Sequence, residues 1–241
     1  MQHRPPSRRD AAAPSPFDAA AARRLRLELG MTPGHVAYGM WAAYGLRVAP
    51  KTVAAWEQGV GAPDESQLTA LAGALWCAPG DLLGSPSTLR EHRLARGLAV
   101  QDAALAAGID RAAYERAEAT GEWTGTPRQA EALAEALRLP PDVRLALTGE
   151  AGRLADLLRS AVTGRWQPYV RPVAKLVPLP RAELSAVLHE MHGTYQSATA
   201  GSHVWGSPDE APEEAAARGR AFLADILDHF WRRAGTGEGD S

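Results

Sequence analysis

An internal repeat constrains the fold of this 241-residue chain more than any other feature of its sequence. Residues 22–31 (ARRLRLELGM) align with residues 89–98 (LREHRLARGL), and residues 71–75 (LAGAL) align with residues 133–137 (LAEAL). Self-similarity of this kind indicates tandem copies of one small structural unit. We therefore expect two related domains, followed by a C-terminal region of different composition.

Apolar spacing predicts that both copies are helical. In the first copy, apolar residues recur with a helical period, strand-like alternation is absent, and glycines separate the predicted helices: Gly30, Gly45, Gly59 and Gly84. The copies differ in their middle parts. The interval from Gly30 to Glu57 is six residues longer than the matching interval that ends at Glu118, and the extra residues fall within 37–49.

Two groups of apolar residues are expected to fill the core of the first copy. The first group has no chemical role and consists of Val53, Trp56, Leu71 and Leu75. The second group lies in the longer middle part and consists of Tyr38, Met40, Trp41 and Tyr44. A stripe at helical spacing is most often core, and we interpret the second group in that way. The alternative is a ligand-pocket wall or a partner surface.

Residues 49–59 (APKTVAAWEQG) have the features of a short helix with two different sides. Pro50 occupies a first helical position, and Gly59 ends the segment. Val53 and Trp56 lie three residues apart and are expected to pack inward. The remaining positions carry small, polar or basic residues, which allow a helix to lie deep in a DNA major groove: Lys51, Thr52, Ala54, Ala55 and Gln58.

Four motifs of the first copy are specific when they are taken together. They are Arg23, Arg26 and Gly30 at the opening, TVAAWEQG at 52–59, Pro63, and the spaced leucines of 68–75. With these motifs the chain resembles the phage-repressor-like (Xre-type) helix-turn-helix family, in particular actinobacterial members with tandem helix-turn-helix domains. The resemblance implies five-helix bundles whose third helix enters the major groove. It also implies that Arg26 pairs with Glu57, and Arg93 with Glu118.

Two departures from the family pattern concern DNA contacts. Family members often begin their second helix with a glutamine, and the matching residues here are Pro33 and Val100. The third helix of the second copy carries acids and lacks the tryptophan, as the residues Asp110, Tyr114, Glu115 and Ala117 show. Carboxylates repel phosphates, so we expect the second copy to serve as packing or dimer scaffold rather than to read DNA strongly.

Three candidate DNA contacts lie outside the recognition helix. Arg23 and Arg47 are interpreted as phosphate contacts, with a solvated arginine as the alternative, and His35 is placed in the same site. Within the helix, Lys51 is assigned to guanine or phosphate, and Thr52 to phosphate or base. The alternative for the helix is the exposed side of a purely structural repeat.

The C-terminal region, residues 150–241, is predicted to be a third helical unit that dimerises the protein or senses a small-molecule or protein effector. Apolar spacing predicts helices over 150–162, 181–196 and 213–233, and a Gly/Ser-rich loop over 200–207. The apolar stripe from Phe222 to Trp231 is the candidate dimer interface. A helix that faces the core is the alternative.

Two further features of this region resemble binding sites. Between Asp156 and Glu183 the chain has no acid but five cations and two aromatic residues: Arg159, Arg165, Arg171, Lys175 and Arg181, with Trp166 and Tyr169. Such a stretch is either a contact for DNA backbone or an anionic ligand, or a solvated face. His189 and His192 have a spacing that a metal can use, but no third ligand is identified, and we predict no metal site.

Composition and charge restrict the function further. The formal net charge is −2, and residues 23–84 are neutral, so the chain lacks the basic footprint of most DNA-binding domains. A few directed cations and helix N-termini can replace that footprint. The single cysteine excludes a disulfide framework and a thiolate zinc site, and no run of apolar residues is long enough to span a bilayer. No catalytic motif is present, so neither enzymatic activity nor a cofactor is expected.

We therefore predict an all-α protein with a disordered arm (1–18), a helix-turn-helix domain (19–84), a second, degenerate one (85–149) and a helical region (150–241). The predicted function is a cytoplasmic, nucleoid-associated transcriptional regulator that binds specific sequences of double-stranded DNA as a homodimer, because paired half-sites multiply affinity. The alternative is a protein-interaction scaffold of degenerate helix-turn-helix domains without DNA binding.

Overall fold

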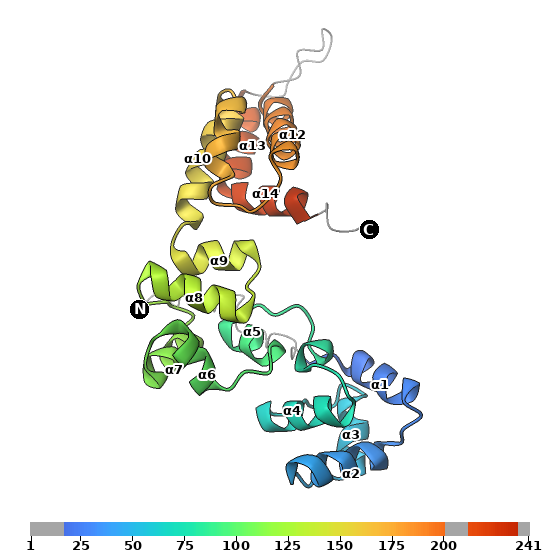
Figure 1. The fold of residues 1–241 in the computed structure, drawn as a ribbon. Helices are drawn as coiled ribbons and strands as arrows, with labels where there is room; N and C mark the ends of the chain where they lie inside the picture. The colour runs from blue at the N-terminus through green and yellow to red at the C-terminus, as the bar shows by residue number, and fades with distance from the viewer. Residues whose placement is uncertain (1–16, 201–211, 236–241) are drawn as a thin grey trace, which may run out of the picture. The chain divides into compact units, whose positions relative to one another are not determined.

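The computed structural model describes residues 17–200 and 212–235. These residues form an all-α protein with fourteen α-helices and no strand among them, which confirms the predicted fold class (Figure 1). The chain divides into two compact units, one ending at Leu139 and one beginning at Pro140. Most of the predicted arm at 1–18 and of the predicted loop at 200–207 lies outside the described residues.

The first unit contains both copies of the repeat. The first copy comprises α1 (Ala19–Glu28), α2 (Pro33–Tyr44), α3 (Pro50–Trp56), α4 (Glu65–Ala74) and the 3₁₀ helix η2 (Pro79–Leu82). The second comprises α5 (Leu89–Ala95), α6 (Val100–Ala107), α7 (Arg111–Thr120) and α8 (Pro127–Leu137). Most of these helices begin at a side-chain cap. For example, Asp18 Oδ1 accepts a hydrogen bond from the backbone N–H of Ala21 at 2.9 Å.

The repeat seen in the sequence is also a repeat of backbone structure. Gly30 and Gly97 have the same φ of +64°, and the left-handed Gly45 and Gly108 end α2 and α6 in the same way. The six extra residues of the first copy are divided between a helix and a turn. α2 has 12 residues where α6 has 8, and the turn that follows α2, residues 45–49, is longer than its counterpart by two residues.

The core of the first copy lies between α2, α3 and α4. The predicted core residues Val53, Trp56, Leu71 and Leu75 are all at most 4% exposed, and they pack with Val36, Met40 and Leu68. Phe17, the residue before the cap of α1, pairs with Leu83 through an isolated bridge and packs on the same core. The prediction of this core is therefore confirmed.

The second unit is a helical bundle with its own core. It comprises α9 (Pro141–Thr148), α10 (Ala151–Thr163), the 3₁₀ helix η3 (Gln167–Tyr169), α11 (Val170–Val173), α12 (Arg181–Thr199), α13 (Pro212–Ala224) and α14 (Ile226–Ala234). The helix expected over 213–233 is broken at Asp225, so that Phe222 and Phe230 both reach the core. α9 lies before the predicted boundary at 149, yet its Leu145 packs in this core.

Candidate nucleic-acid interface

The candidate interface is formed by α2, α3 and the turn that joins them (Figure 1). α2 begins with a capping box in which Thr32 Oγ1 accepts a hydrogen bond from the backbone N–H of His35 at 3.2 Å. It ends at Gly45, whose φ of +68° lies in the region that glycine adopts without strain. Pro50 then opens α3 at a position where no backbone N–H is needed. These local signals fix the direction in which α3 leaves α2.

The helix α3 has one buried side and one accessible side. Val53 and Trp56 are 1% and 4% exposed. Among the other predicted contact residues, the long side chains of Lys51 and Gln58 are exposed. The short ones are half-buried: Thr52, Ala54 and Ala55. Two long polar side chains therefore flank a stretch of small ones, and this arrangement lets a helix backbone approach a groove closely.

An arginine from α1 anchors the end of α3. Arg26 Nε donates to Glu57 Oε1 at 2.6 Å, and Arg26 Nη2 donates to Glu57 Oε2 at 2.7 Å. A third bond runs from Arg26 Nη1 to the carbonyl oxygen of Met31 at 2.7 Å. The bidentate contact with Glu57 raises the pKa of Arg26, and so stabilises its positive charge at this position. The structure thus contains the first ion pair that the family resemblance implied.

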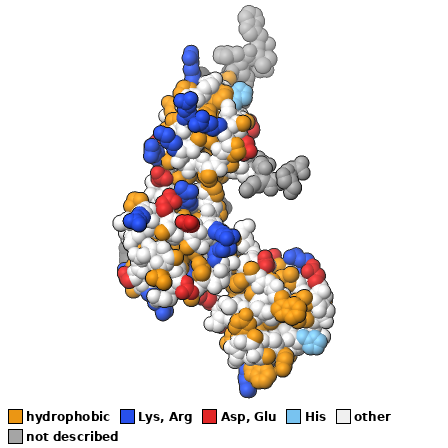
Figure 2. Space-filling model, viewed as in Figure 1, with side chains coloured by type: hydrophobic (Ala, Val, Ile, Leu, Met, Phe, Trp, Pro, Cys, Tyr) orange, Lys and Arg blue, Asp and Glu red, His pale blue; other side chains and the backbone are white. Residues whose placement is uncertain are grey.

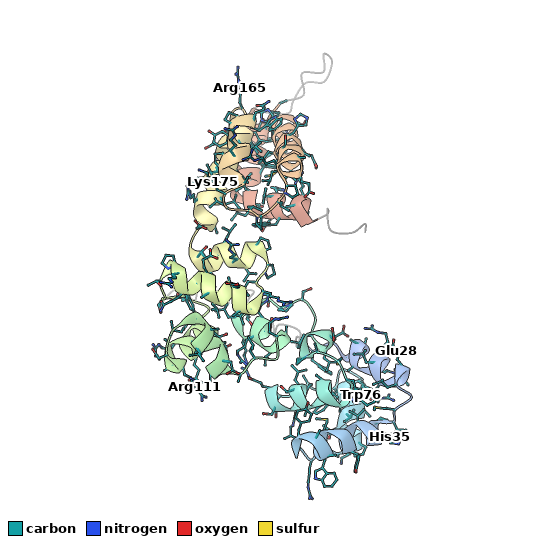
Figure 3. All side chains as sticks on the ribbon, viewed as in Figure 1. Glu28, His35, Trp76, Arg111, Arg165 and Lys175 are labelled. Atoms are coloured by element: carbon teal, nitrogen blue, oxygen red, sulfur yellow. The ribbon has the colours of Figure 1, made fainter. Side chains whose placement is uncertain are left out.

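The three candidate contacts outside α3 have different surroundings. Arg23 and Gln58 line one open groove between α1 and the end of α3. Arg47, in the turn before α3, is exposed, and its Cζ lies 6.0 Å from the centre of the Trp41 ring. His35 lies at the start of α2, where its Nδ1 accepts a bond from the backbone N–H of Thr32 at 3.3 Å (Figure 3). Sequence reasoning missed this capping role of His35.

Three aromatic side chains of α2 are exposed, so the core interpretation of this group is wrong for all but Met40. The exposed fractions are 65%, 44% and 47% for Tyr38, Trp41 and Tyr44. The reason is that α2 contains no Asp, Glu, Lys or Arg and packs only its inner side, with the buried Met40, into the core. Trp76, just after α4, is 80% exposed and has a φ of +54° (Figure 3). The partner-surface alternative fits this arrangement.

The matching helix of the second copy, α7, has a different surface. Tyr114, which occupies the position of Val53 in the first copy, is fully buried. It takes this place because Ala117 stands where the first copy has its tryptophan and leaves room for a larger neighbour. Asp110 caps the helix, and Glu115 Oε1 accepts a hydrogen bond from Arg111 Nε at 2.7 Å. The accessible side of α7 is therefore occupied by a paired acid.

The counterpart of Arg26, Arg93, is fully buried and binds two carboxylates. Arg93 Nε donates to Glu118 Oε1 at 2.7 Å, the second ion pair that the resemblance implied. Arg93 Nη1 also donates to Glu65 Oε1 at 2.6 Å, and Glu65 is the first residue of α4 in the other copy. Burial alone would lower the pKa of Arg93, but the two carboxylates raise it, and the contact with Arg93 lowers the pKa of Glu65. Arg93 thus links the copies.

The apolar stripe of the second unit is not an exposed interface. Phe222, Ile226 and Phe230 are 6%, 1% and 0% exposed, and Trp231 packs against the same core. The prediction that this stripe is the dimer interface is therefore wrong, and the core-facing alternative is correct. The stripe is buried because α13 and α14 fold back onto the other helices of their unit.

The two histidines of α12 have structural surroundings. His192 Nδ1 lies 3.0 Å from the carbonyl oxygen of Val162. The ring of His189 packs against Trp166, with 5.4 Å between ring centres. Across the described ranges 17–200 and 212–235, no group of three or more potential metal ligands is found. None of the helices in these ranges is long and apolar enough to cross a membrane.

Comparison with known proteins adds no relative to this picture. No family model matches the chain, and no curated protein or solved structure matches it. The resemblance to Xre-type regulators therefore stays a prediction from the motifs of the first copy.

Proposed function

We propose that the protein is a transcriptional regulator that binds specific sequences of double-stranded DNA through α3. The observation that carries this proposal is the accessible side of α3, where the exposed Lys51 and Gln58 flank small residues. A long polar side chain can reach base edges when the helix backbone lies close to the groove floor. The Arg26–Glu57 pair supports the proposal, because it holds the end of α3 against α1.

Phosphate contacts would come from the cations around α3. Arg23 and Arg47 are exposed, and among the described residues neither forms an ion pair with an acid. Arginine is well suited to phosphate because its planar guanidinium can donate two parallel hydrogen bonds. Such contacts fix the register of a helix on the duplex without reading its sequence.

We include homodimerisation in the proposal. A single domain of this size buries too little DNA surface for tight binding, and two half-sites bound by a symmetric dimer supply the missing affinity. We place the protein in the cytoplasm, at the nucleoid, and assign a regulatory role to its second unit.

The proposal is tested by selecting binding sequences for the 241-residue chain from a pool of duplexes with randomised sequence. We expect one enriched sequence, bound with a steep dependence on salt. Lys51→Ala should weaken binding of that duplex by about 1–3 kcal/mol. Arg116→Ala, which removes an exposed cation of α7, is the matched control and should leave the affinity unchanged. A pool without enrichment would contradict the proposal.

A protein-interaction scaffold is the second candidate, and one observation favours it. Trp41 and Trp76 of the first copy are 44% and 80% exposed, and Tyr38 packs against Trp41 with 5.6 Å between ring centres. Tryptophan and tyrosine dominate the binding energy of many protein interfaces. A scaffold would bind a protein partner through these side chains and would show no salt-dependent binding of DNA.

A further inference from the structure

The second unit has an unbalanced distribution of charge. Five cations and no acid lie between Asp156 and Glu183, although residues 150–241 as a whole carry a net charge of −2. Figure 2 shows Lys and Arg side chains gathered on the visible surface of this unit, with acidic side chains at its margins. Arg165 and Lys175 project from this surface in Figure 3.

Four of the five cations are available to a ligand, and we call them the basic face: Arg165, Arg171, Lys175 and Arg181. All four are exposed, and within the described part of the chain none of them forms an ion pair or a hydrogen bond with an acid. Arg159 is different, because its Nη1 donates to Asp156 Oδ1 at 3.0 Å and its Nε donates to the carbonyl oxygen of Leu223 at 3.2 Å. Arg159 therefore has a structural role.

The backbone keeps the basic face directed outward. The segment that joins α10 to α12 buries Val173, Leu176 and Val177, which are 0%, 6% and 1% exposed. Arg171 and Lys175 alternate with these anchors and stay in solvent. The four prolines of the segment limit its freedom further: Pro168, Pro172, Pro178 and Pro180. Buried anchors and prolines therefore restrain the backbone that carries Arg171 and Lys175.

We propose that the basic face binds the phosphate backbone of double-stranded DNA without reading its sequence. This inference rests on the proposed function and deepens it. The first copy, residues 23–84, is neutral overall, whereas DNA-binding proteins usually obtain much of their affinity by neutralising phosphates. Four cations of the same chain, unpaired within its described residues, supply that attraction, because several exposed positive charges on one unit raise the local concentration of a polyanion.

The composition of the second unit favours DNA over a lipid surface. Peripheral membrane proteins combine basic residues with exposed large apolar side chains that enter the bilayer. The large apolar side chains that are exposed all belong to the first unit, from Leu27 to Leu105, and none is found in the described residues from Pro140 onward. Trp166 and Tyr169, which lie beside the face, are partly buried against the core.

The test compares two triple variants of the 241-residue chain in binding a duplex of random sequence. The first is Arg165→Gln/Arg171→Gln/Lys175→Gln. The second, Arg96→Gln/Arg116→Gln/Arg128→Gln, removes the same charge from exposed arginines of the second copy. Circular dichroism melting confirms that both variants are folded.

We expect the basic-face variant to bind the random duplex at least tenfold more weakly at low salt. The slope of log affinity against log salt should fall in magnitude by roughly 2 to 3, about 0.9 for each phosphate that is no longer neutralised. The control variant should keep most of its affinity. Equal losses in the two variants would show an effect of net charge alone and would overturn the inference, and so would the absence of any loss. Binding to vesicles that contain phosphatidylserine, without binding to the duplex, would overturn it as well.

A second measurement separates this inference from the proposed function. The ratio of affinities for the selected duplex and the random duplex should not change in the basic-face variant, but it should fall in Lys51→Ala. If selection yields no sequence while the basic-face variant still loses affinity for the random duplex, the proposed function fails and the backbone contact stands. If the ratio alone falls in the basic-face variant, the face reads sequence and the inference is wrong.

Discussion

The two copies in the first unit share a set of structural residues, which we call the frame, but they differ in their surface residues. Each has an arginine on its first helix, a left-handed glycine after that helix, and a glutamate seven residues beyond the start of its third helix. Arg26 binds Glu57 in one copy, and Arg93 binds Glu118 in the other, at nearly the same distance. The frame therefore fixes the fold, and the surface is free to vary.

The accessible sides of α3 and α7 show how far that freedom extends. Lys51 and Ala54 of α3 correspond to Ala112 and Glu115 of α7. The second copy has no cation at the position of Lys51, and it has an acid, paired with Arg111, at the position of Ala54. Among the described residues, one frame thus carries an unpaired cation at this position in the first copy and an Arg–Glu pair beside it in the second. The following predictions test this comparison.

The largest expected effect concerns the two buried arginines. Arg93→Ala leaves Glu118 without its partner and Glu65 with only its longer contact to Arg90, at 3.7 Å, and should lower the free energy of unfolding by roughly 3–5 kcal/mol. Arg26→Ala leaves only Glu57 and should fall at the lower end of the same range. Urea unfolding followed by circular dichroism measures both, and Arg96→Ala, an exposed arginine, is the control. A larger loss for Arg26→Ala than for Arg93→Ala would contradict the comparison.

A smaller effect is expected from exchanging the buried pairs of the third helices. Val53 and Trp56 fill the core of the first copy, whereas Tyr114 and Ala117 fill that of the second with large and small residues in reversed order. Ala117→Trp should cost about 1–3 kcal/mol by overpacking. Adding Tyr114→Val should recover part of this cost, which a double-mutant cycle measures as a coupling energy. If the effects of the two changes on stability are additive, residues 114 and 117 do not share one space in the core, and the comparison with Val53 and Trp56 fails.

The smallest expected effect is the pH dependence of the stability that the pair of Glu65 and Arg93 contributes. Because the contact with Arg93 lowers the pKa of Glu65 below its ordinary value of 4.5, this pair contributes stability above that pH. The contribution is lost as the pH falls through the lowered pKa, because the protonated carboxyl no longer attracts the guanidinium. Glu65→Gln should therefore cost about 1–2 kcal/mol at pH 7 and less at about pH 3. The urea midpoints of wild type and variant at the two pH values measure this cost. An equal cost at both would show that the charge of Glu65 does not contribute to stability.

The local chemistry of the chain was sufficient to predict the frame. The repeat, the glycine positions and the buried side of α3 follow from residue spacing, because caps, left-handed glycines and helical periodicity act over a few residues. The all-α fold and the core around Trp56 were predicted for the same reason. The Arg–Glu pairs required the family resemblance, since their partners lie far apart in the sequence.

Features that depend on tertiary packing were not predictable. Tyr114 occupies the position that matches the buried Val53, and only the packing around it shows that the small Ala117 leaves space for a side chain of this size. Trp41 has the spacing of a core residue but is exposed. The sequence does not show this, because α2 has no charged residue that would mark its outer side. The bond between Arg93 and Glu65 joins the two copies, and no pattern within either copy indicates it. Each of these three features depends on the residues that pack against a side chain from distant parts of the sequence.

The central claim, that α3 contacts DNA and α7 does not, is tested most directly by placing the same charge at matched positions. Lys51→Glu and Ala112→Glu alter corresponding exposed residues of the two helices. Binding of the selected duplex, measured by fluorescence anisotropy at fixed salt, should weaken at least tenfold in Lys51→Glu and stay close to wild type in Ala112→Glu, because only α3 would lose a groove contact. An equal loss of affinity in both variants, or no loss in either, would contradict the claim.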